Sequence, residues 1–386
     1  MNLNAIRKKE MRYGIGLEAG STCRGINACL LRIKGAGPGL HIKLVRHQHF
    51  ALTAGLRTRL MAARFDAREM GLLNCEVGEQ LAEAACEMIN LAKEESIEVD
   101  FVASDGHTLA LSPPRGGSIS VGVLQLGEPA MIAERVQLPV VSDFRARDLA
   151  AGGQGSPISA YADWLLFAKE NRTVVCLHLG GTPRIVVVPP KIETVIAFDT
   201  GPGMLAIDGA VRLLTAGTHE TDQDGASAGR GVVIDEFLEY LLDHPYLGRV
   251  PPKGAAREDF GADGYLRDAL AARKGRSFED LIATVTTAVA YSIIRAYNRF
   301  VKPQYEVARF VVSGGGVLNK TLMACLRNGL PDTVVRTSDE YGLPGPAHDV
   351  VGCTILANET ICGTPTLIPG ATGARRPALL GKITPN

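Results

Sequence analysis

The sequence predicts an α/β protein of two domains, and three observations lead to this expectation. The chain has 386 residues, which suggests roughly two domains that each bury a core of their own. In both halves antiparallel strands come first, and alternating strands and helices follow. Glycine-rich turns follow strands in residues 13–25, 199–203 and 314–316. Such turns let backbone groups approach an anion, so the sequence indicates a nucleotide held between two domains.

The first half of the chain begins with a predicted β-hairpin over Tyr13–Ile33, and a third strand is expected over His41–Ala51. Helical spacing of apolar residues predicts helices over Leu56–Met70 and Val77–Lys93. Further strands are expected at Phe101–Ser104, Ile119–Leu124 and Val140–Ser142, and a short helix at Pro129–Arg135.

The second half repeats this order without a detectable sequence repeat. Strands are expected at Val174–Leu179, Ile185–Val188 and Thr194–Phe198, followed by a helix over Met204–Leu214. An apolar stripe from Ile282 to Phe300 predicts one long helix. A strand at Phe310–Val312, a helix directly after Gly316, a strand at Val334–Thr337 and a helix from about Pro346 complete the pattern.

Composition excludes several classes of function. Lys and Arg number 41 and Asp and Glu also number 41, so there is no basic footprint for nucleic acid and no polybasic membrane patch. No apolar run approaches the roughly 20 residues that span a bilayer, and the polar, basic start does not resemble a secretory signal. The 8 cysteines form no C-x-x-C pair, which favours reduced thiols. We expect a soluble cytoplasmic protein.

The most informative segment is the predicted strand that ends in Asp199 and is followed by Gly201, Gly203 and a helix. This layout places one acid beside the free N–H groups of a helix N-terminus, which attract phosphate. An acid in that place can take a proton from an attacking hydroxyl group. The alternative is that Asp199 only caps the helix.

The other two turns carry the groups that a nucleotide needs. The tip of the first hairpin contains Gly20, Ser21 and Thr22, with hydroxyls and a backbone that can approach an anion. The glycines Gly314, Gly315 and Gly316 let a flat ligand lie on the backbone near the start of a helix.

Several motifs in one order give the chain a resemblance to a known family. They are Asp143–Asp148 followed by Ala-Ala-Gly-Gly-Gln-Gly155, Phe198–Gly203, Pro251–Lys253 with Arg257–Phe260, Gly314–Gly316 with Asn319, and Asp339–Gly342. Over nearly the whole chain the sequence resembles the anhydro-N-acetylmuramic acid kinases, whose relatives include levoglucosan kinase. The resemblance implies a two-domain actin/hexokinase-like (ribonuclease-H-like) fold with ATP in the cleft between the domains. The domains are expected at residues 1–148 plus about 366–386, and at 149–365.

The resemblance also implies an activity. The family uses ATP and Mg²⁺, opens a 1,6-anhydro bond and phosphorylates O6 of the sugar in cell-wall recycling, and it forms homodimers. We therefore expect a small sugar as substrate and a homodimer. A catalytically lapsed homologue that binds nucleotide or sugar as a sensor is the main alternative, and a hydrolytic ATPase is a weaker one.

Site residues follow from the resemblance position by position. Asp199 matches the catalytic base. The two phosphate loops match the Gly14–Gly25 hairpin, with Gly20, Ser21, Thr22 and Arg24, and the Leu179–Thr182 segment, with Gly180 and Gly181. Lys253 lies next to the nucleotide, and Gly314, Gly315, Gly316 and Asn319 form the adenosine site. Arg145 and Arg147 bind sugar or phosphate, or pair with Asp143 and Asp148.

The departures from the family fall around the sugar and the metal. Ser104-Asp105-Gly106-His107-Thr108 stands where the family has Ser-His-Gly-Gln-Thr, so Asp105, His107 and Thr108 are expected to contact a different, neutral sugar. Arg24 replaces an Asp, His178 and Met204 each replace an Asn, Asp163 replaces a His, and the metal-binding Glu near the C-terminus is Asp349. We hypothesise that Glu18 takes over the Mg²⁺ contact and that Arg24 touches phosphate directly.

Overall fold

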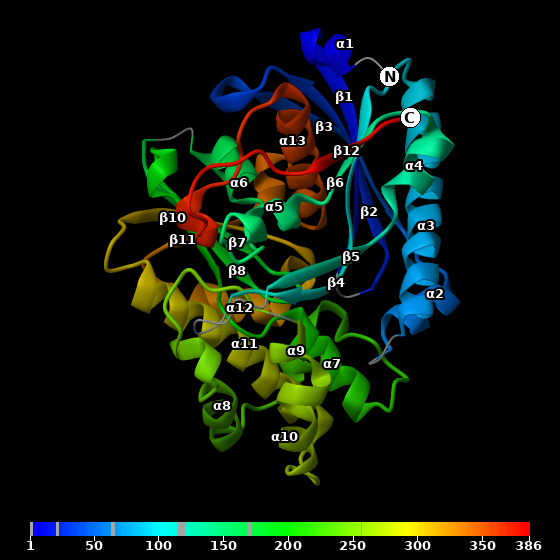
Figure 1. The fold of residues 1–386 in the computed structure, drawn as a ribbon. Coiled ribbons are helices and arrows are strands. Elements are labelled where there is room, and N and C mark those ends of the chain that lie inside the picture. Colours follow the sequence, from blue (N-terminus) through cyan, green and yellow to red (C-terminus); the bar gives the residue numbers. More distant parts are fainter. Residues whose placement is uncertain (1–2, 21–22, 63–65, 115–120, 169–170, 256) are drawn as a thin grey trace. The chain divides into compact units, whose positions relative to one another are not determined.

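The computed structural model describes residues 3–20, 23–62, 66–114, 121–168, 171–255 and 257–386, except the side chains of residues 257, 258 and 263. They form two compact units (Figure 1). The first unit contains Met1–Leu166, Pro346–Pro369 and Gly373–Asn386, and the second contains Phe167–Gly345 and Gly370–Thr372.

The first unit is built on a sheet with strand order β12-β6-β4-β1-β2-β3, and β5 pairs with β4. Its strands are β1 (Met11–Ala19), β2 (Ile26–Lys34), β3 (His41–Phe50), β4 (Phe101–Ser112), β5 (Gly122–Leu126), β6 (Val140–Ser142) and β12 (Lys382–Thr384). Its helices are α1 (Leu3–Lys8), α2 (Ala54–Leu60), α3 (Ala67–Glu94), α4 (Pro129–Val136), α5 (Phe144–Ala150), α6 (Ala160–Phe167, whose last residue belongs to the second unit) and α13 (His348–Cys362). Helices α3 and α13 lie on opposite sides of the sheet (Figure 1).

The second unit has a sheet of 5 strands in the order β11-β10-β7-β8-β9. The strands are β7 (Thr173–His178), β8 (Arg184–Val188), β9 (Ile196–Asp199), β10 (Val307–Ser313) and β11 (Val334–Thr337). The helices are α7 (Met204–Leu214), α8 (Asp235–Leu242), α9 (Arg257–Phe260), α10 (Arg267–Ala271), α11 (Phe278–Phe300) and α12 (Lys320–Gly329). Helix α14 (Pro369–Thr372) begins at the last residue of a first-unit segment.

The two sheets share one arrangement of strands. In each, the first three strands are antiparallel, as in β1-β2-β3 and β7-β8-β9. Two parallel strands then extend the sheet on the other side of the first strand, β4 and β6 in one unit and β10 and β11 in the other. This is the ribonuclease-H-like order in duplicate, so the predicted fold class is confirmed.

Most of the predicted elements are confirmed, and the apolar stripe explains the longest helix. Residues of α11 that recur at helical spacing, including Ile282, Val289 and Ile293, are fully buried in the core of the second unit. In the first unit, Leu73, Val77 and Leu81 of α3 pack in the same way against the sheet. Both cores therefore form on the apolar faces that the sequence indicates.

Two predicted boundaries are wrong. The predicted helix Leu56–Met70 is divided, because α2 ends at Leu60 and the Asp66 side chain caps α3 by accepting a hydrogen bond from Glu69 N. Helix α3 thus starts well before the predicted Val77. The helix predicted directly after Gly316 starts at Lys320, because a 3₁₀ turn over Gly315–Leu318 comes first.

The third difference concerns β4, which was expected to end at Ser104. The strand continues to Ser112 and pairs with β5 (Gly122–Leu126), whereas we expected a strand at Ile119–Leu124, part of which lies outside the described residues. Gly106 has φ +57 and sits at a register shift opposite Glu18, so a bulge bends the strand without ending it. Asp105, His107 and Thr108 therefore lie on a strand and not on a loop.

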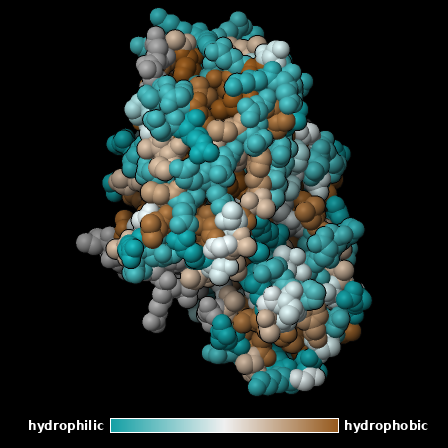
Figure 2. Space-filling view, turned by 90° about the vertical axis from the view of Figure 1, so that its right-hand side faces the viewer, coloured by the Kyte–Doolittle hydropathy of each residue, from teal (hydrophilic) through white to brown (hydrophobic). Residues whose placement is uncertain are grey.

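Throughout the part of the chain that the structure describes, no helix has the length and apolar character needed to cross a membrane. Hydrophilic residues cover most of the face seen in Figure 2, and hydrophobic residues gather there in separate patches.

Candidate active site

Asp199 ends strand β9 and is almost completely buried, with 2 % of its surface exposed. Its Oδ2 accepts a hydrogen bond from Ala255 N at 2.8 Å, and its N–H donates to Lys253 O at 2.9 Å. Its carbonyl oxygen accepts from the Tyr246 hydroxyl at 3.0 Å. The first contact orients the carboxylate and the other two hold the backbone of Asp199 in place, as a proton acceptor in a reaction requires.

Lys253 lies beside this acid and is buried as well. Its Nζ donates a hydrogen bond to Tyr246 O at 3.3 Å and lies 4.7 Å from the centre of the Tyr246 ring. Burial lowers the pKa of Lys253 to about 8, although the nearby Asp199 carboxylate acts in the opposite direction. Lys253 is therefore a positive charge held inside the second unit.

The turn after Asp199 excludes the alternative role of this acid as a helix cap, and it differs from the expectation in one respect. The N-cap residue of α7 is Gly203, so Asp199 does not cap that helix. The first N–H groups of α7 are also not free, since Met204 N donates to Gly180 O at 3.0 Å and Leu205 N donates to Gly181 O at 3.1 Å. The predicted phosphate-binding N–H groups at these two residues are thus used within the protein.

Gly201 and Gly203 are required by close packing. A Cβ on Gly201 would lie 2.6 Å from Leu247 Cδ2, and a Cβ on Gly203 would lie 2.6 Å from Pro183 Cδ. Neither distance is possible for a real Cβ atom without a shift of the neighbours. The two glycines hold the Asp199 turn against its neighbours.

The three consecutive glycines after β10 have different surroundings. Gly314 has φ +87, and a Cβ on it would lie 2.7 Å from Leu179 O. Gly316 N donates to the same Leu179 carbonyl at 2.9 Å, and a Cβ there would lie 2.7 Å from Leu179 Cβ. A Cβ on Gly315 would meet nothing within 4 Å. Only Gly315 therefore has the open space that a ligand lying on the backbone needs.

Asn319 stands at the start of α12 and is buried, with 3 % exposed. Its Oδ1 accepts a hydrogen bond from Leu322 N at 2.9 Å and caps the helix. The amide nitrogen of the same side chain is buried without a hydrogen-bond partner among the described residues. A buried donor of this kind is suited to an acceptor on a ligand.

In the first unit, the turn between β1 and β2 forms the predicted hairpin tip. Cys23 N donates a hydrogen bond to Gly20 O at 3.0 Å, and Arg24 is exposed. The predicted ligands Ser21 and Thr22 lie outside the described residues.

Three carboxylates gather next to this tip. A Cβ on Gly20 would lie 3.3 Å from Glu18 Oε1, so the Glu18 carboxylate faces the turn. Burial raises the pKa of Glu18 to about 8, and the negative charges of Asp349 and Asp105 contribute. A divalent cation takes oxygen ligands and would relieve the repulsion at Glu18. Glu18 and Asp349 thus stay candidate Mg²⁺ ligands, whereas Asp105 is paired with Arg145.

Arg145 is paired with Asp105, and the expected alternatives Asp143 and Asp148 have other partners. Arg145 Nη2 lies 3.0 Å from Asp105 Oδ2, and its Nη1 donates to Gly155 O at 3.0 Å. Asp143 pairs with Lys382, and Asp148 Oδ2 accepts from Gly155 N at 2.6 Å. Arg147 on the same helix is exposed. The sequence missed the Asp105–Arg145 pair because no local pattern links β4 to α5.

The side chains of His107 and Thr108 contact neighbouring parts of the first unit. His107 is fully buried, with Nδ1 3.3 Å from Ala19 O and Nε2 3.9 Å from Cys23 Sγ. Thr108 Oγ1 accepts a hydrogen bond from Gln125 Nε2 at 3.3 Å. His107 thus packs against the end of β1 at Ala19 and against the turn between β1 and β2 at Cys23.

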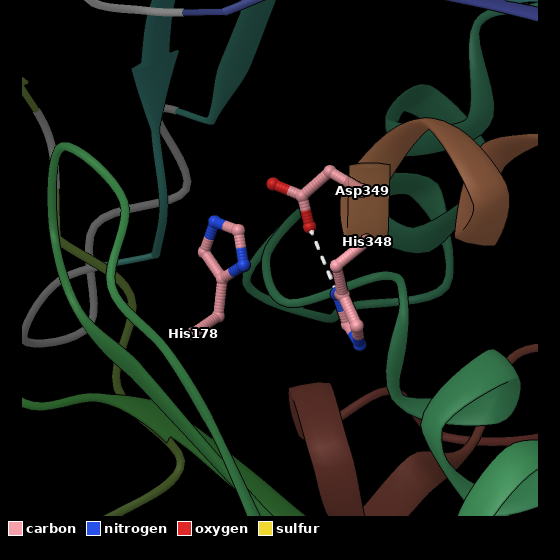
Figure 3. Close-up of side chains that lie close together, drawn as sticks. All are labelled: His178, His348 and Asp349. Atoms are coloured by element: carbon pink, nitrogen blue, oxygen red, sulfur yellow. Dashed lines mark ion pairs between the residues drawn. The ribbon is translucent and has the colours of Figure 1, made fainter. Parts of the chain in front are cut away.

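Next to Asp349 lies a buried ion pair between His348 and Asp163, which the sequence did not predict. His348 Nε2 is 2.7 Å from Asp163 Oδ1, and both side chains are almost fully buried. The Asp163 charge raises the pKa of His348 to about 9 against the effect of burial. His348 Nδ1 lies 3.6 Å from Asp349 Oδ1, the pair marked in Figure 3. Asp163 and His348 are far apart in sequence, so no motif spacing could have signalled the pair.

Each unit thus assembles one group of the predicted residues. The second unit brings together Asp199, Lys253 and the glycines at positions 180, 181, 201 and 203. Gly314–Gly316 follow β10, and Asn319 begins α12. The first unit brings together Glu18, Gly20, Asp105, Arg145 and Asp349.

Comparison with known proteins identifies the family of this chain. The family described as anhydro-N-acetylmuramic acid kinase matches residues 11–386. An anhydro-N-acetylmuramic acid kinase of Caldanaerobacter subterraneus subsp. tengcongensis is 38% identical, with 98% of each chain covered. One from Bacillus cereus is 35% identical and covers 96% of this chain and 99% of its own length. This chain therefore belongs to the anhydro-N-acetylmuramic acid kinase family.

Proposed function

We propose that this chain is a kinase that uses ATP and Mg²⁺ to convert a 1,6-anhydro-sugar into a sugar 6-phosphate. The observation that carries the proposal is Asp199, whose buried carboxylate accepts a hydrogen bond from Ala255 N at the end of a strand, beside a buried lysine. The family to which the chain belongs supports the assignment.

The reaction requires one proton acceptor. Water adds to the anomeric carbon, the bond from that carbon to O6 breaks, and O6 forms a bond to the γ-phosphorus while ADP leaves. Asp199 takes the proton that the water loses. A fixed base contributes about 10²- to 10⁴-fold to such a step. Ala255 N–H orients the carboxylate, and the Lys253 charge stabilises its ionised form.

Binding of the nucleotide is assigned to glycine-rich segments. Gly315 offers open space and Asn319 offers a buried amide donor, so we place the adenosine near them. Gly20 and Arg24 in one unit, and Gly180 and Gly181 in the other, are proposed to contact phosphates. Since the N–H groups of Met204 and Leu205 are used inside the protein, α7 contributes no phosphate contact through them.

Glu18 and Asp349 would hold Mg²⁺, with Asp105 close by. The cation supplies neutralisation of the phosphate charge during transfer. The Asp163–His348 pair would hold Asp349 in place from behind.

A direct assay tests the proposal. ADP release from ATP is measured with 1,6-anhydroglucose and anhydro-N-acetylmuramic acid, and nucleotide binding is followed by thermal shift. We expect sugar-dependent ADP release and a sugar 6-phosphate product. Nucleotide binding without turnover on any anhydro-sugar would favour a lapsed sensor, and ADP release that no sugar stimulates would favour an ATPase.

The Asp105–Arg145 pair bears on the charge of the preferred sugar. Asp105 neutralises Arg145, so this pair offers no net positive charge to an acidic substituent. We therefore propose that a neutral anhydro-sugar is preferred over anhydro-N-acetylmuramic acid, whose lactyl group is negatively charged. Asp105→Asn would free Arg145 and shift the ratio of kcat/KM toward the acidic sugar by about 10-fold. A wild-type preference for the acidic sugar that the substitution leaves unchanged would contradict this assignment.

The proposal includes a homodimer, as the resemblance implies, and a cytoplasmic location, as the composition suggests. Light scattering at working concentration should give twice the mass of 41.0 kDa, and a mass of one chain would refute the dimer.

A further inference from the structure

A cavity in the second unit is not used by the proposed reaction. It has a volume of about 650 Å³ and lies between α11 and the segment 242–248 that follows α8. Small-molecule sites in proteins have volumes of roughly 300–1,000 Å³. The cavity is therefore large enough for a monosaccharide phosphate.

One face of α11 contributes two positively charged side chains to the wall of this cavity. Ser292, Arg295, Ala296 and Arg299 all line it, and their spacing along the helix places them on one face. Both arginines are exposed and stand one helical turn apart. Two guanidinium groups at this separation match a phosphate, which each can bind through parallel hydrogen bonds.

Some arginines of the same unit are held by a carboxylate. Arg212 and Arg336 lie 3.7 Å from Glu220 and Glu340. Across the described residues, no such ion pair is found for Arg295 or Arg299. A helix C-terminus favours a cation in its last turn, which by itself would account for Arg299. It does not account for a second arginine on the wall of the same cavity.

The remaining lining suits a sugar. Asp243 can accept hydrogen bonds from hydroxyl groups, and Leu247 and Phe300 offer apolar surface to the carbon skeleton. We propose that this cavity binds a phosphorylated sugar, with the phosphate on Arg295 and Arg299 and the hydroxyl groups toward Asp243.

The cavity is connected to the Asp199 turn. Two of its lining residues, Leu247 and Ser292, also pack against Gly201, where a Cβ would lie 2.6 Å and 3.3 Å from their side chains. Lys253 Nζ lies 3.5 Å from Leu247 O, and the Arg299 charge helps to lower the pKa of Lys253. A phosphate on Arg299 would oppose that effect, so an occupied cavity is expected to change turnover. The binding is independent of the kinase activity, whereas this consequence rests on the proposed function.

The experiment is calorimetric titration of the full chain with glucose 6-phosphate, glucose and inorganic phosphate. We expect glucose 6-phosphate to bind more tightly than either fragment. The double variant Arg295→Gln/Arg299→Gln should weaken this binding about 10-fold or more, because charge-assisted hydrogen bonds are lost. Arg327→Gln is the matched control, since Arg327 is an exposed arginine in the last turn of α12 but does not line the cavity. It should bind as the wild type does.

Three results would overturn the proposal. They are no binding of glucose 6-phosphate up to roughly 10 mM, equal affinity in wild type and double variant, or competition by a non-hydrolysable ATP analogue, which would place the ligand at the proposed nucleotide site. Melting temperature and ATP affinity confirm that the double variant is folded, and the single variant Arg295→Gln replaces it if it is not. If the protein had no kinase turnover but still bound glucose 6-phosphate through Arg295 and Arg299, the proposed function would be refuted and the second site would be supported.

Discussion

The two units share one strand order, but the ends of their equivalent strands are built differently. In the first unit, β1 ends in a turn beside the acid Glu18, and β4 runs on through a bulge that carries Asp105. In the second unit, the equivalent β7 ends in the segment Leu179–Pro183, whose carbonyls accept N–H groups from α7 and from Gly316. One unit thus gathers negative charge at its strand ends, and the other joins its glycines in a backbone hydrogen-bond network beside the acid Asp199.

In the proposed function, this difference would divide the reaction between the two units. A cluster of carboxylates in which burial, and then the charges of Asp349 and Asp105, raise the pKa of Glu18 to about 8 would be relieved by a cation. A single buried carboxylate with its orientation fixed is suited to accept a proton. The four predictions below test this division, beginning with the largest expected effect.

Asp199→Asn should lower turnover by about 10² to 10⁴, because the amide keeps the shape of the side chain but cannot accept a proton. Its oxygen can still accept from Ala255 N, so ATP affinity and melting temperature should stay close to the wild type. Steady-state kinetics and calorimetry measure these quantities. Unchanged turnover would show that Asp199 is structural and would remove the division between the units.

Gly315→Val should weaken ATP binding by about 10-fold or more with little change in stability, since a side chain there enters open space where the ligand is expected. Gly314→Val is the matched control. It places a side chain against Leu179 O at a positive φ, so it should lower the melting temperature instead. Equal loss of stability in both variants would mean that Gly315 serves packing.

Glu18→Gln should raise the Mg²⁺ concentration needed for ATP binding, by about 10-fold, because a carboxylate ligand is lost from the first unit. Glu98→Gln, at an exposed position of the same unit, is the control. ATP affinity measured over a range of Mg²⁺ concentrations gives the answer. The same Mg²⁺ dependence in wild type and Glu18→Gln would exclude Glu18 from the cation site.

Lys253 should give the smallest effect, a dependence of stability on pH. Its pKa in the folded protein is about 8 and its ordinary value is 10.5, so the unfolded chain binds more protons between these values. Stability therefore gains a contribution as pH rises from about 8 to 10.5. Lys253→Met should lack this contribution in denaturant melts over that range. If stability depended on pH in the same way in both proteins, folding would not lower the pKa of Lys253.

Local pattern predicted most elements because each depends on neighbours in sequence. Strand β6 and helix α7 begin and end at the predicted residues, and the stripe of α11 is buried as expected. The misplaced boundaries have local causes that apolar spacing does not reveal. Asp66 starts α3 by capping it, and Gly106 allows β4 to continue through a bulge.

The sequence alone determined the fold class, the family and the place of Asp199 at the end of a strand, because periodicity, glycine turns and motif order are all local or linear properties. Only the tertiary structure decided which charges meet. The pairs Asp105–Arg145 and Asp163–His348, and the Gly180 and Gly181 carbonyls that receive the first N–H groups of α7, join segments far apart in the chain. Such contacts follow from how strands and helices pack in three dimensions, and no spacing along the sequence encodes them.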